Sequence, residues 1–280
     1  MKRSRVALVT GASAGIGFDT AIALRDAGFT VYAGARRLEK MEPLKGHGIT
    51  VLSLDVTSEE SMATAVALVE EAHGHLDVLV NNAGYGSYGS LEEVPLAEGR
   101  RQLEVNVMGL ARMTQLVIPG MRRVRSGRII NVTSIGGKIY EPLGSWYHAS
   151  KFAVEGMSDS LRLELTPHGI DVVIVEPSGT NSEWGTIAGE GLLATSGDGP
   201  YQQQAHVVAA ALASTSGEGH VLSTPARVVA NVIVRAATAK RPRTRYPVGR
   251  GAWSVLALRK FLPDRAFDVV FWNLYRRLAG

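Results

Sequence analysis

The chain lacks cysteine, long apolar runs and internal repeats. None of its 280 residues is cysteine, which excludes disulfides and thiolate metal sites, and nothing requires an oxidising compartment. No apolar run is long enough to span a bilayer. The basic start leads into an apolar stretch, Val6 to Val9, that is too short for a signal peptide. We therefore expect a cytoplasmic protein without a metal site.

The composition is typical of a soluble globular protein. Apolar residues make up 45% of the chain, charged residues make up 20%, and the net charge is only +4. These values favour one large core and no nucleic-acid partner. We expect residues 1–280 to form a single domain, because no second boundary is visible in the sequence.

Short apolar runs alternate with longer helical patterns through the first two thirds of the chain. Runs rich in Val, Ile and Leu without strict alternation are typical of parallel strands that are buried on both faces. The pattern predicts an α/β fold of the Rossmann type, with a doubly wound parallel sheet. The predicted strands are 6–9, 30–33, 50–54, 78–80, 128–132 and 171–175, and the predicted helices are 16–27, 58–73, 102–119 and 150–166.

The pattern weakens over residues 181–224, where glycine, serine, threonine and alanine are scattered. We interpret this stretch as a mobile substrate-covering loop inserted in the domain. Pro225 then begins another predicted helix, which runs to about Thr238.

Residues 240–280 form a basic and apolar C-terminal extension, which we expect to be helical. Its arginines and lysines far outnumber its acids, Asp264 and Asp268, and it also carries aromatic residues such as Trp253 and Phe271. The favoured interpretation is that its apolar face packs on the protein itself or on a second subunit. The alternative is weak peripheral contact with a membrane surface.

A glycine-rich turn follows the first predicted strand. It reads Thr10 to Gly17, with glycines at 11, 15 and 17, and a helix comes next. Glycines permit a tight turn and close backbone approach, so that the free N–H groups of the helix can hold a pyrophosphate. A glycine-rich turn alone is weak evidence, but the strand before it and the helix after it are the context of a dinucleotide site.

No acidic residue stands about ~20 positions beyond that turn, where it would bind the ribose 2′-hydroxyl of NAD. The second strand instead leads to Arg36 and Arg37. Two guanidinium groups at this place favour a 2′-phosphate, so we expect the cofactor to be NADP(H). The alternative is that both arginines simply belong to a solvated helix start.

Tyr147 and Lys151 lie four residues apart on a predicted helix, so they project from one face. A neighbouring ammonium favours the phenolate and lowers the pKa of a tyrosine. Such a pair can therefore act as a proton donor and acceptor. Alone it is also common on solvated helix faces, so its meaning depends on the other motifs.

These motifs resemble the short-chain dehydrogenase/reductase family over nearly all of residues 5–180, within its hydroxysteroid and retinol dehydrogenase-like branch. The family's motifs appear here in the same order and at the same spacing. They are the turn Thr10 to Gly17, the run Asn81 to Gly84, Ser134, the pair Tyr147 and Lys151, and Asn106. By themselves, Asn81 to Gly84 could form a plain turn and Ser134 could cap a helix.

The resemblance implies catalytic roles for four residues. Tyr147 would exchange a proton with the substrate oxygen, and Lys151 would lower the pKa of Tyr147 and bind the nicotinamide ribose. Ser134 would hold the substrate oxygen, and Asn106 would fix a water that links Lys151 to solvent. His148 is interpreted as an ordinary polar residue that faces away from the chemistry.

The resemblance also implies the cofactor contacts. The glycine turn would line the pyrophosphate, the strand ends would hold the adenosine, and the segment after the sixth strand would lie by the nicotinamide. That last segment departs slightly from the family, with Pro177-Ser178 where many members have Pro-Gly. The expected cofactor-binding residues are Gly11, Ser13, Gly15, Ile16, Gly17, Arg36, Arg37, Asp55, Val56, Asn82, Ala83, Gly84, Tyr147, Lys151, Pro177, Ser178 and Thr180.

The branch implies a small hydrophobic ketone or alcohol as substrate, of the steroid, retinoid or lipid kind. Two alternatives stay open: a ketoreductase or tailoring enzyme of secondary metabolism, and a non-catalytic NADP-sensing protein. Retention of both Tyr147 and Lys151 argues against the sensor. Relatives pair through the helices that carry Asn106 and Tyr147, so we expect a homodimer or homotetramer.

Overall fold

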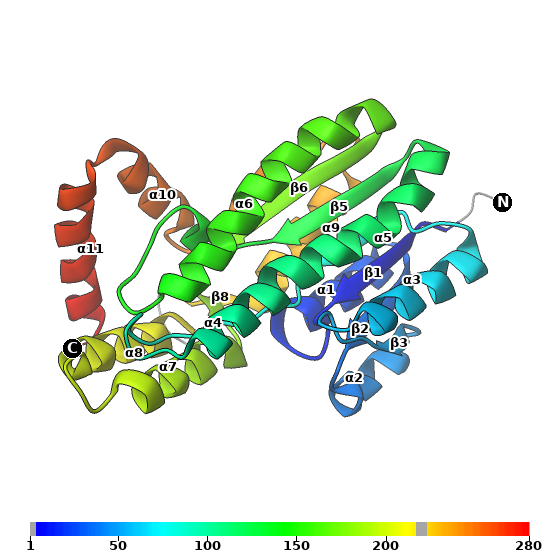
Figure 1. Cartoon of the computed structure of the whole chain (residues 1–280). Helices are drawn as coiled ribbons and strands as arrows, with labels where there is room; N and C mark the ends of the chain where they lie inside the picture. Colours follow the sequence, from blue (N-terminus) through cyan, green and yellow to red (C-terminus); the bar gives the residue numbers. More distant parts are fainter. Residues whose placement is uncertain (1–3, 217–222, 280) are drawn as a thin grey trace.

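A seven-stranded parallel sheet lies at the centre of the computed structural model, which describes residues 4–216 and 223–279 (Figure 1). Its order is β3-β2-β1-β4-β5-β6-β9. The order reverses between β1 and β4, which opens a crevice outside their carboxyl ends. The doubly wound prediction is confirmed. The strands are β1 Val6–Thr10, β2 Thr30–Ala35, β3 Thr50–Ser53, β4 Val78–Asn81, β5 Gly127–Val132, β6 Ile170–Pro177 and β9 Arg245–Val248.

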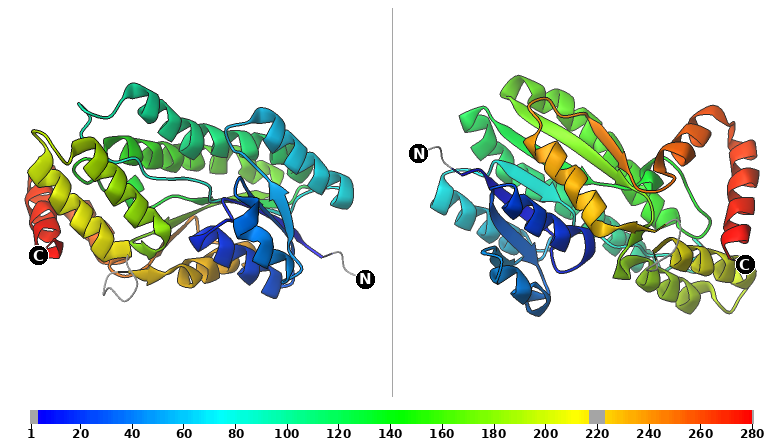
Figure 2. Two further views of the ribbon diagram at one scale, coloured as in Figure 1. Left: turned by 90° about the horizontal axis from the view of Figure 1, so that it is seen from below. Right: turned by 180° about the vertical axis from the view of Figure 1, so that it is seen from behind.

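Helices cover both faces of this sheet (Figures 1 and 2). Helices α1 Gly15–Asp26, α2 Leu38–Lys45 and α9 Ala226–Thr238 share one apolar cluster with one face of the strands. Helices α3 Glu59–His73, α5 Gly109–Val124 and α6 Ser145–Leu165 share a second cluster with the opposite face. Strands such as β1 and β4 are buried at every residue, which explains their continuous apolar sequences.

The helix predicted over 102–119 is interrupted. The chain forms α4 Leu96–Leu103, a π-helical turn Glu104–Met108, and then α5. The wider turn holds Asn106 inward, 3% exposed, where its amide bonds the backbone of Tyr85. A π turn inside a helical segment is often found at functional sites.

The loop predicted over residues 181–224 is wrong for most of its length. The chain there forms α7 Glu183–Ser196 and α8 Gln202–Ser216, flanked by the short strands β7 Thr180–Asn181 and β8 Thr224–Pro225. Small residues in this stretch serve close packing of the two helices rather than flexibility. A Cβ built at Gly189 would already lie 3.6 Å from the carbonyl oxygen of Ala209. Residues 217–222 of the predicted loop lie outside the described residues.

The C-terminal extension also differs from its prediction, because its first part is the edge strand β9, which pairs with β6. The helices α10 Ala252–Phe261 and α11 Asp264–Leu278 follow, and α11 lies beside α8 (Figure 1). Phe267, Phe271 and Tyr275 bury one face of α11 in the same apolar cluster as Tyr147. This face therefore packs on the protein itself, which is one of the two forms of the favoured interpretation. Within residues 4–216 and 223–279, no helix is long and apolar enough to cross a membrane.

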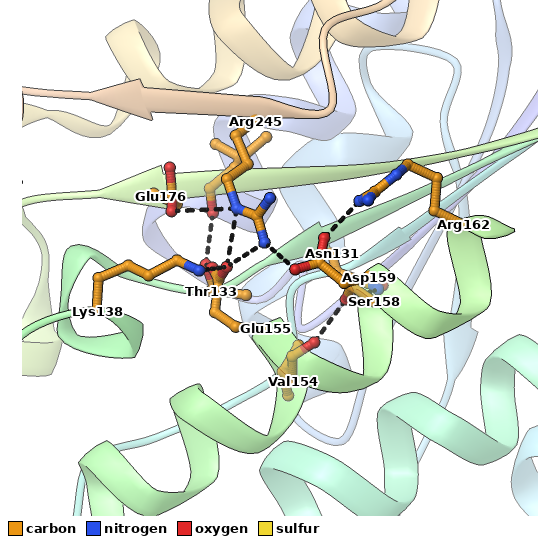
Figure 3. Close-up of polar contacts among 11 residues, drawn as sticks. Asn131, Thr133, Lys138, Val154, Glu155, Ser158, Asp159, Arg162, Glu176 and Arg245 are labelled. Atoms are coloured by element: carbon orange, nitrogen blue, oxygen red, sulfur yellow. Dashed lines mark hydrogen bonds and ion pairs between the residues drawn. The ribbon is translucent and has the colours of Figure 1, made fainter.

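A buried cluster of charges joins α6 to the edge of the sheet (Figure 3). Arg245 of β9 reaches Asp159 at 2.6 Å, Glu155 at 3.1 Å and Glu176 at 3.8 Å. Lys138 pairs with Glu155 at 3.0 Å, and Thr133 donates to the same carboxylate. Burial, followed by the charge of Glu155, raises the pKa of Glu176 to about 7 against the opposing charges of Arg245 and Lys138.

We predict that Glu176 makes the stability fall with rising pH. The unfolded carboxyl releases its proton near its ordinary pKa of 4.5, whereas the folded one holds it to about 7. Its contribution is therefore present below pH 4.5 and is lost as the pH rises to about 7, a change on the order of 2 to 3 kcal/mol. Glu176→Gln should remove this pH dependence in urea unfolding at pH 5 and pH 8. Glu164→Gln, at an exposed position of α6, is the control; wild-type and Glu176→Gln stabilities that change in parallel would contradict the prediction.

Candidate active site

The glycine turn is fastened to the end of β4 by hydrogen bonds. The hydroxyl of Thr10 accepts from the backbone N–H groups of Asn82 and Ala83, both at 3.0 Å. The Asn82 side-chain amide donates to the carbonyls of Thr10 at 3.0 Å and Gly11 at 3.2 Å. Gly11 has a φ of +66°, and an added Cβ would lie 2.7 Å from the Cα of Ala83. Asn82 therefore supports the turn, whereas the sequence predicted only a contact with the adenosine ribose.

The N-terminus of α1 is free to hold an anion. Its N-cap residue, Ala14, makes no side-chain cap, and the first turn contains no acidic residue. The orphan N–H groups of a helix start and its positive dipole end are the groups that bind phosphates. Gly15 has a φ of +52°, which gives the turn a conformation that side chains rarely adopt. These features fit the pyrophosphate expected at Gly11, Ser13, Gly15, Ile16 and Gly17.

Cationic side chains lie at the carboxyl end of β2. Arg36 and Arg37 are exposed, and Arg37 donates to the hydroxyl of Ser13 at 3.2 Å. Glu183, the first residue of α7, pairs with Lys40 at 2.9 Å and with Arg37 at 3.6 Å. Lys40 was not among the residues predicted to bind the cofactor, although it stands only three positions beyond Arg37. Together these cations fit a bound phosphate.

Asp55 and Val56 lie beyond the end of β3. One oxygen of Asp55 accepts from the backbone N–H and the hydroxyl of Thr57, at 2.9 and 2.8 Å. Although burial acts in the opposite direction, these bonds and the charge of Arg36 lower the pKa of Asp55. Val56 is buried, and its carbonyl lies against Gly109. The structure thus places Asp55 within the electrostatic reach of Arg36, on the side of the crevice expected to hold the adenosine.

The four residues expected to be catalytic come together at the carboxyl ends of the central strands. Ser134 follows β5, and its side chain lies close enough to the phenol of Tyr147, in the first turn of α6, to affect its pKa. The Nζ of Lys151 lies 6.0 Å from the centre of the Tyr147 ring and donates to the carbonyl of Val132 at 3.2 Å. A Cβ built at Gly84 would lie 3.9 Å from that Nζ and 3.1 Å from the Asn106 Oδ1, so Asn106 lies next to Lys151.

Asn106 is held from two sides. Its Oδ1 accepts from the N–H of Tyr85 at 3.1 Å, and its Nδ2 donates to the carbonyl of Tyr85 at 2.9 Å. The same amide donates to the hydroxyl of Ser150 at 3.1 Å, which in turn donates to the carbonyl of Tyr147 at 2.7 Å. The π turn is thereby tied to the first turn of α6.

The pKa of Tyr147 moves in the direction opposite to the one that the sequence predicts. Burial raises it, the nearby Ser134 hydroxyl opposes the rise, and the charge of Glu141 adds to it. Burial also lowers the pKa of Lys151 to about 8, against the charge of Glu155. Tyr147 is only 6% exposed, and this burial keeps its phenol protonated at neutral pH.

The segment after β6 lies beside Ser134. The hydroxyl of Ser134 donates to the carbonyl of Pro177 at 3.4 Å. Ser178 donates from its N–H to the carbonyl of Val248 and from its hydroxyl to the carbonyl of Arg250. Thr180 donates to the carbonyl of Ser178 at 3.0 Å. The residues expected next to the nicotinamide are thus anchored to the turn after β9.

His148 has a structural role that sequence analysis missed. It is buried, its Nε2 lies 3.0 Å from the N–H of Glu141, and its Nδ1 lies 2.8 Å from the carbonyl of Gly136. A neutral ring that accepts at Nε2 and donates at Nδ1 satisfies both groups. His148 therefore clamps the segment between Ser134 and Tyr147, and does not face away from it.

Two further aromatic residues cover Tyr147. Ring centres lie 5.6 Å apart for Tyr88 and Tyr147, and 5.1 Å apart for Trp184 and Tyr147. Trp184 belongs to α7, and a Cβ at Gly86 would collide with its indole. Neither ring carried a sequence signal, since both come from segments outside the recognised motifs.

Comparison with known proteins agrees with this arrangement. The profile of the short chain dehydrogenase family matches residues 5–190. The uncharacterized oxidoreductase YusZ of Bacillus subtilis is 36% identical, with 95% of this chain and 96% of that protein covered. The NADPH-dependent 3-dehydrocapnine reductase of Ornithobacterium rhinotracheale is 32% identical, with coverage of 98% and 99%. A short-chain dehydrogenase from Streptomyces avermitilis has a crystal structure that superposes with a TM-score of 0.81, at 30% identity and 98% coverage of both chains.

We predict that His148→Ala destabilises the fold and slows turnover. The substitution leaves the N–H of Glu141 and the carbonyl of Gly136 without their partner, at a cost of about 1 to 3 kcal/mol. Thermal unfolding and steady-state rates would measure both effects. His168→Ala, in the turn before β6, is the control. A His148→Ala protein with wild-type stability and rate would contradict the clamp.

Proposed function

Because the chain belongs to the short-chain dehydrogenase/reductase family of nicotinamide-dependent oxidoreductases, we propose that it uses NADP(H) to interconvert a ketone and an alcohol on a hydrophobic substrate. The observation that carries this proposal is the meeting of Ser134, Tyr147 and Lys151. They meet at the carboxyl edge of the sheet, near the glycine turn. Proton donor, oxyanion partner and cation thus share one site.

The bound nicotinamide would supply the hydride in reduction and accept it in oxidation. Tyr147 donates its phenolic proton to the substrate oxygen, and Ser134 donates a hydrogen bond to that oxygen as negative charge develops. Lys151 stabilises the phenolate left on Tyr147. A phenol that keeps its proton at neutral pH is suited to reduction, since it must be a donor when the substrate binds.

The preference for NADP(H) rests on charge. Arg36, Arg37 and Lys40 gather at the end of β2, and the strand end itself carries no acidic residue, although Glu183 of α7 pairs with Arg37 and Lys40. One relative is itself named as NADPH-dependent. A 2′-phosphate would pair with guanidinium and ammonium groups that NADH leaves unused.

The apolar substrate preference rests on the walls around Tyr147. Tyr88, Leu192 and Phe271 are buried in the same cluster as Tyr147, and α7 and α8 supply much of it. We propose that the helices α7 and α8, which form most of the described part of residues 181–224, cover the substrate. This arrangement provides apolar surface next to the reacting carbonyl.

Two further proposals concern contacts of the whole protein. A homodimer or homotetramer would form through α5 and α6, where Phe152 and Leu163 expose apolar side chains. Weak peripheral membrane contact would use the exposed Trp253, Phe261 and Val269 of the C-terminal extension.

We predict that Tyr147→Phe lowers kcat at least about 100-fold, because it removes the proton donor while preserving the ring. NADPH oxidation with a panel of hydrophobic ketones would measure the rate, and titration of NADPH would show that cofactor binding persists. Tyr201→Phe removes a surface phenol that bonds Glu92 and is the control. Retention of most activity by Tyr147→Phe would refute the assignment.

We predict that replacing Arg36 and Arg37 together by alanine raises the Kd for NADPH about tenfold or more and leaves the Kd for NADH nearly unchanged. Fluorescence titration with each cofactor would measure both constants. Lys45→Ala, at the C-terminal end of α2, is the control because Lys45 pairs only with nearby Glu42 in the described ion pairs. NADH binding equal to or tighter than NADPH binding in the wild-type protein would contradict the proposed preference for NADP(H).

A further inference from the structure

A carboxylate that the proposed reaction does not use lies beside Tyr147. Glu141 accepts a hydrogen bond from the hydroxyl of Tyr88 at 3.1 Å, and Tyr275 of α11 lies close enough for the charge of Glu141 to act on its phenol. Burial and Glu141 raise the pKa of both phenols well above the usual value. The two tyrosines therefore stay neutral, and Tyr88 serves as a donor to the carboxylate.

No protein cation balances this carboxylate in the described structure. Among residues 4–216 and 223–279, none of the ion pairs includes Glu141. A carboxylate has about four lone-pair positions, and the phenol of Tyr88 occupies one of them. Glu141 can thus accept further hydrogen bonds.

The charge of Glu141 opposes the proposed chemistry. Proton donation turns Tyr147 into a phenolate, and a nearby carboxylate disfavours that second negative charge; burial is the main cause of the raised pKa of Tyr147, and the charge of Glu141 adds to it. A positive charge bound next to Glu141 would remove this penalty. A substrate could carry that charge into the site.

The ring of Tyr88, which bonds Glu141, and the ring of Trp184 beside it suit such a cation. Tyr88 and Trp184 meet edge to face with ring centres 6.0 Å apart, and both also contact Tyr147. Ammonium groups bind against aromatic faces as well as to carboxylates. The same cluster continues into apolar side chains of α8 and α11.

We propose that Glu141, Tyr88 and Trp184 bind a protonated amine carried by the substrate close to its carbonyl. The substrate is then a hydrophobic amino ketone, and the product is the corresponding amino alcohol. The amine is unchanged in the reaction: hydride adds to the carbonyl carbon and a proton adds to its oxygen. This inference rests on the proposed function and names its substrate class.

The test compares two ketones on the wild-type enzyme with NADPH. One is a long-chain α-amino ketone, assayed where the amine is protonated, and the other is the α-methyl ketone of the same chain, in which an uncharged group of similar size replaces the ammonium. We expect kcat/KM to favour the amino ketone at least about tenfold, as for a hydrogen bond between charged groups. Glu141→Gln should reduce that ratio to about one. Glu92→Gln, at an exposed carboxylate that also accepts from a tyrosine, should preserve it.

A binding measurement on the wild-type enzyme covers the case in which Glu141→Gln fails to fold. A long-chain alkylammonium should compete with the methyl ketone, and the uncharged N-acetyl derivative of that amine should compete at least about tenfold more weakly. Equal reduction of both ketones, or reduction of the methyl ketone alone, overturns the inference and leaves the proposed function intact. If neither these two ketones nor any ketone of the hydrophobic panel is reduced, both the inference and the proposed function are wrong.

Discussion

The site depends on the hydroxyl of Thr10, which accepts hydrogen bonds from two backbone N–H groups just after β4. It fixes the crevice where the strand order reverses, and Asn82 returns two bonds to the glycine turn. The turn therefore has one position relative to Gly84, and Gly84 lies against Asn106 and near Lys151. An error in this junction would displace the glycine turn from the proton-transfer residues.

The second support is the charged cluster under α6. Arg245 holds Glu155 and Asp159 of that helix from the last strand of the sheet, and Lys138 reaches Glu155 from the segment after Ser134. Arg245 and Lys138 are partly exposed, whereas Glu155 is buried, so removing either cation leaves less compensation for a buried carboxylate, which is unfavourable. Glu155 stands one helical turn beyond Lys151, and its charge opposes the loss of the lysine's proton. Strand β9 thus bears on the site although it lies at the edge of the sheet.

Much of the fold could be predicted because its signals are local. Continuous apolar runs marked the first six strands, and glycines marked the ends of α1 and α3. Helices α7 and α8 were missed because small residues can indicate either close packing or a loop. Strand β9 was missed because its sequence, Arg245 to Val248, contains a proline and an arginine. His148 and Glu141 gain their roles only from folding, since their partners come from separate segments.

The pKa of Tyr147 shows the limit of reasoning from spacing. Lys151 at four residues' distance predicts a lowered pKa, yet covering the ring with Tyr88 and Trp184 removes water, and burial becomes the larger effect. Burial also lowers the pKa of Lys151, so its ammonium group loses its proton more readily than that of an exposed lysine. Tyr147 therefore keeps its proton until a bound positive charge stabilises the phenolate or a developing alkoxide accepts the proton. The aromatic cover therefore belongs to the proton-transfer chemistry as well as to the apolar wall.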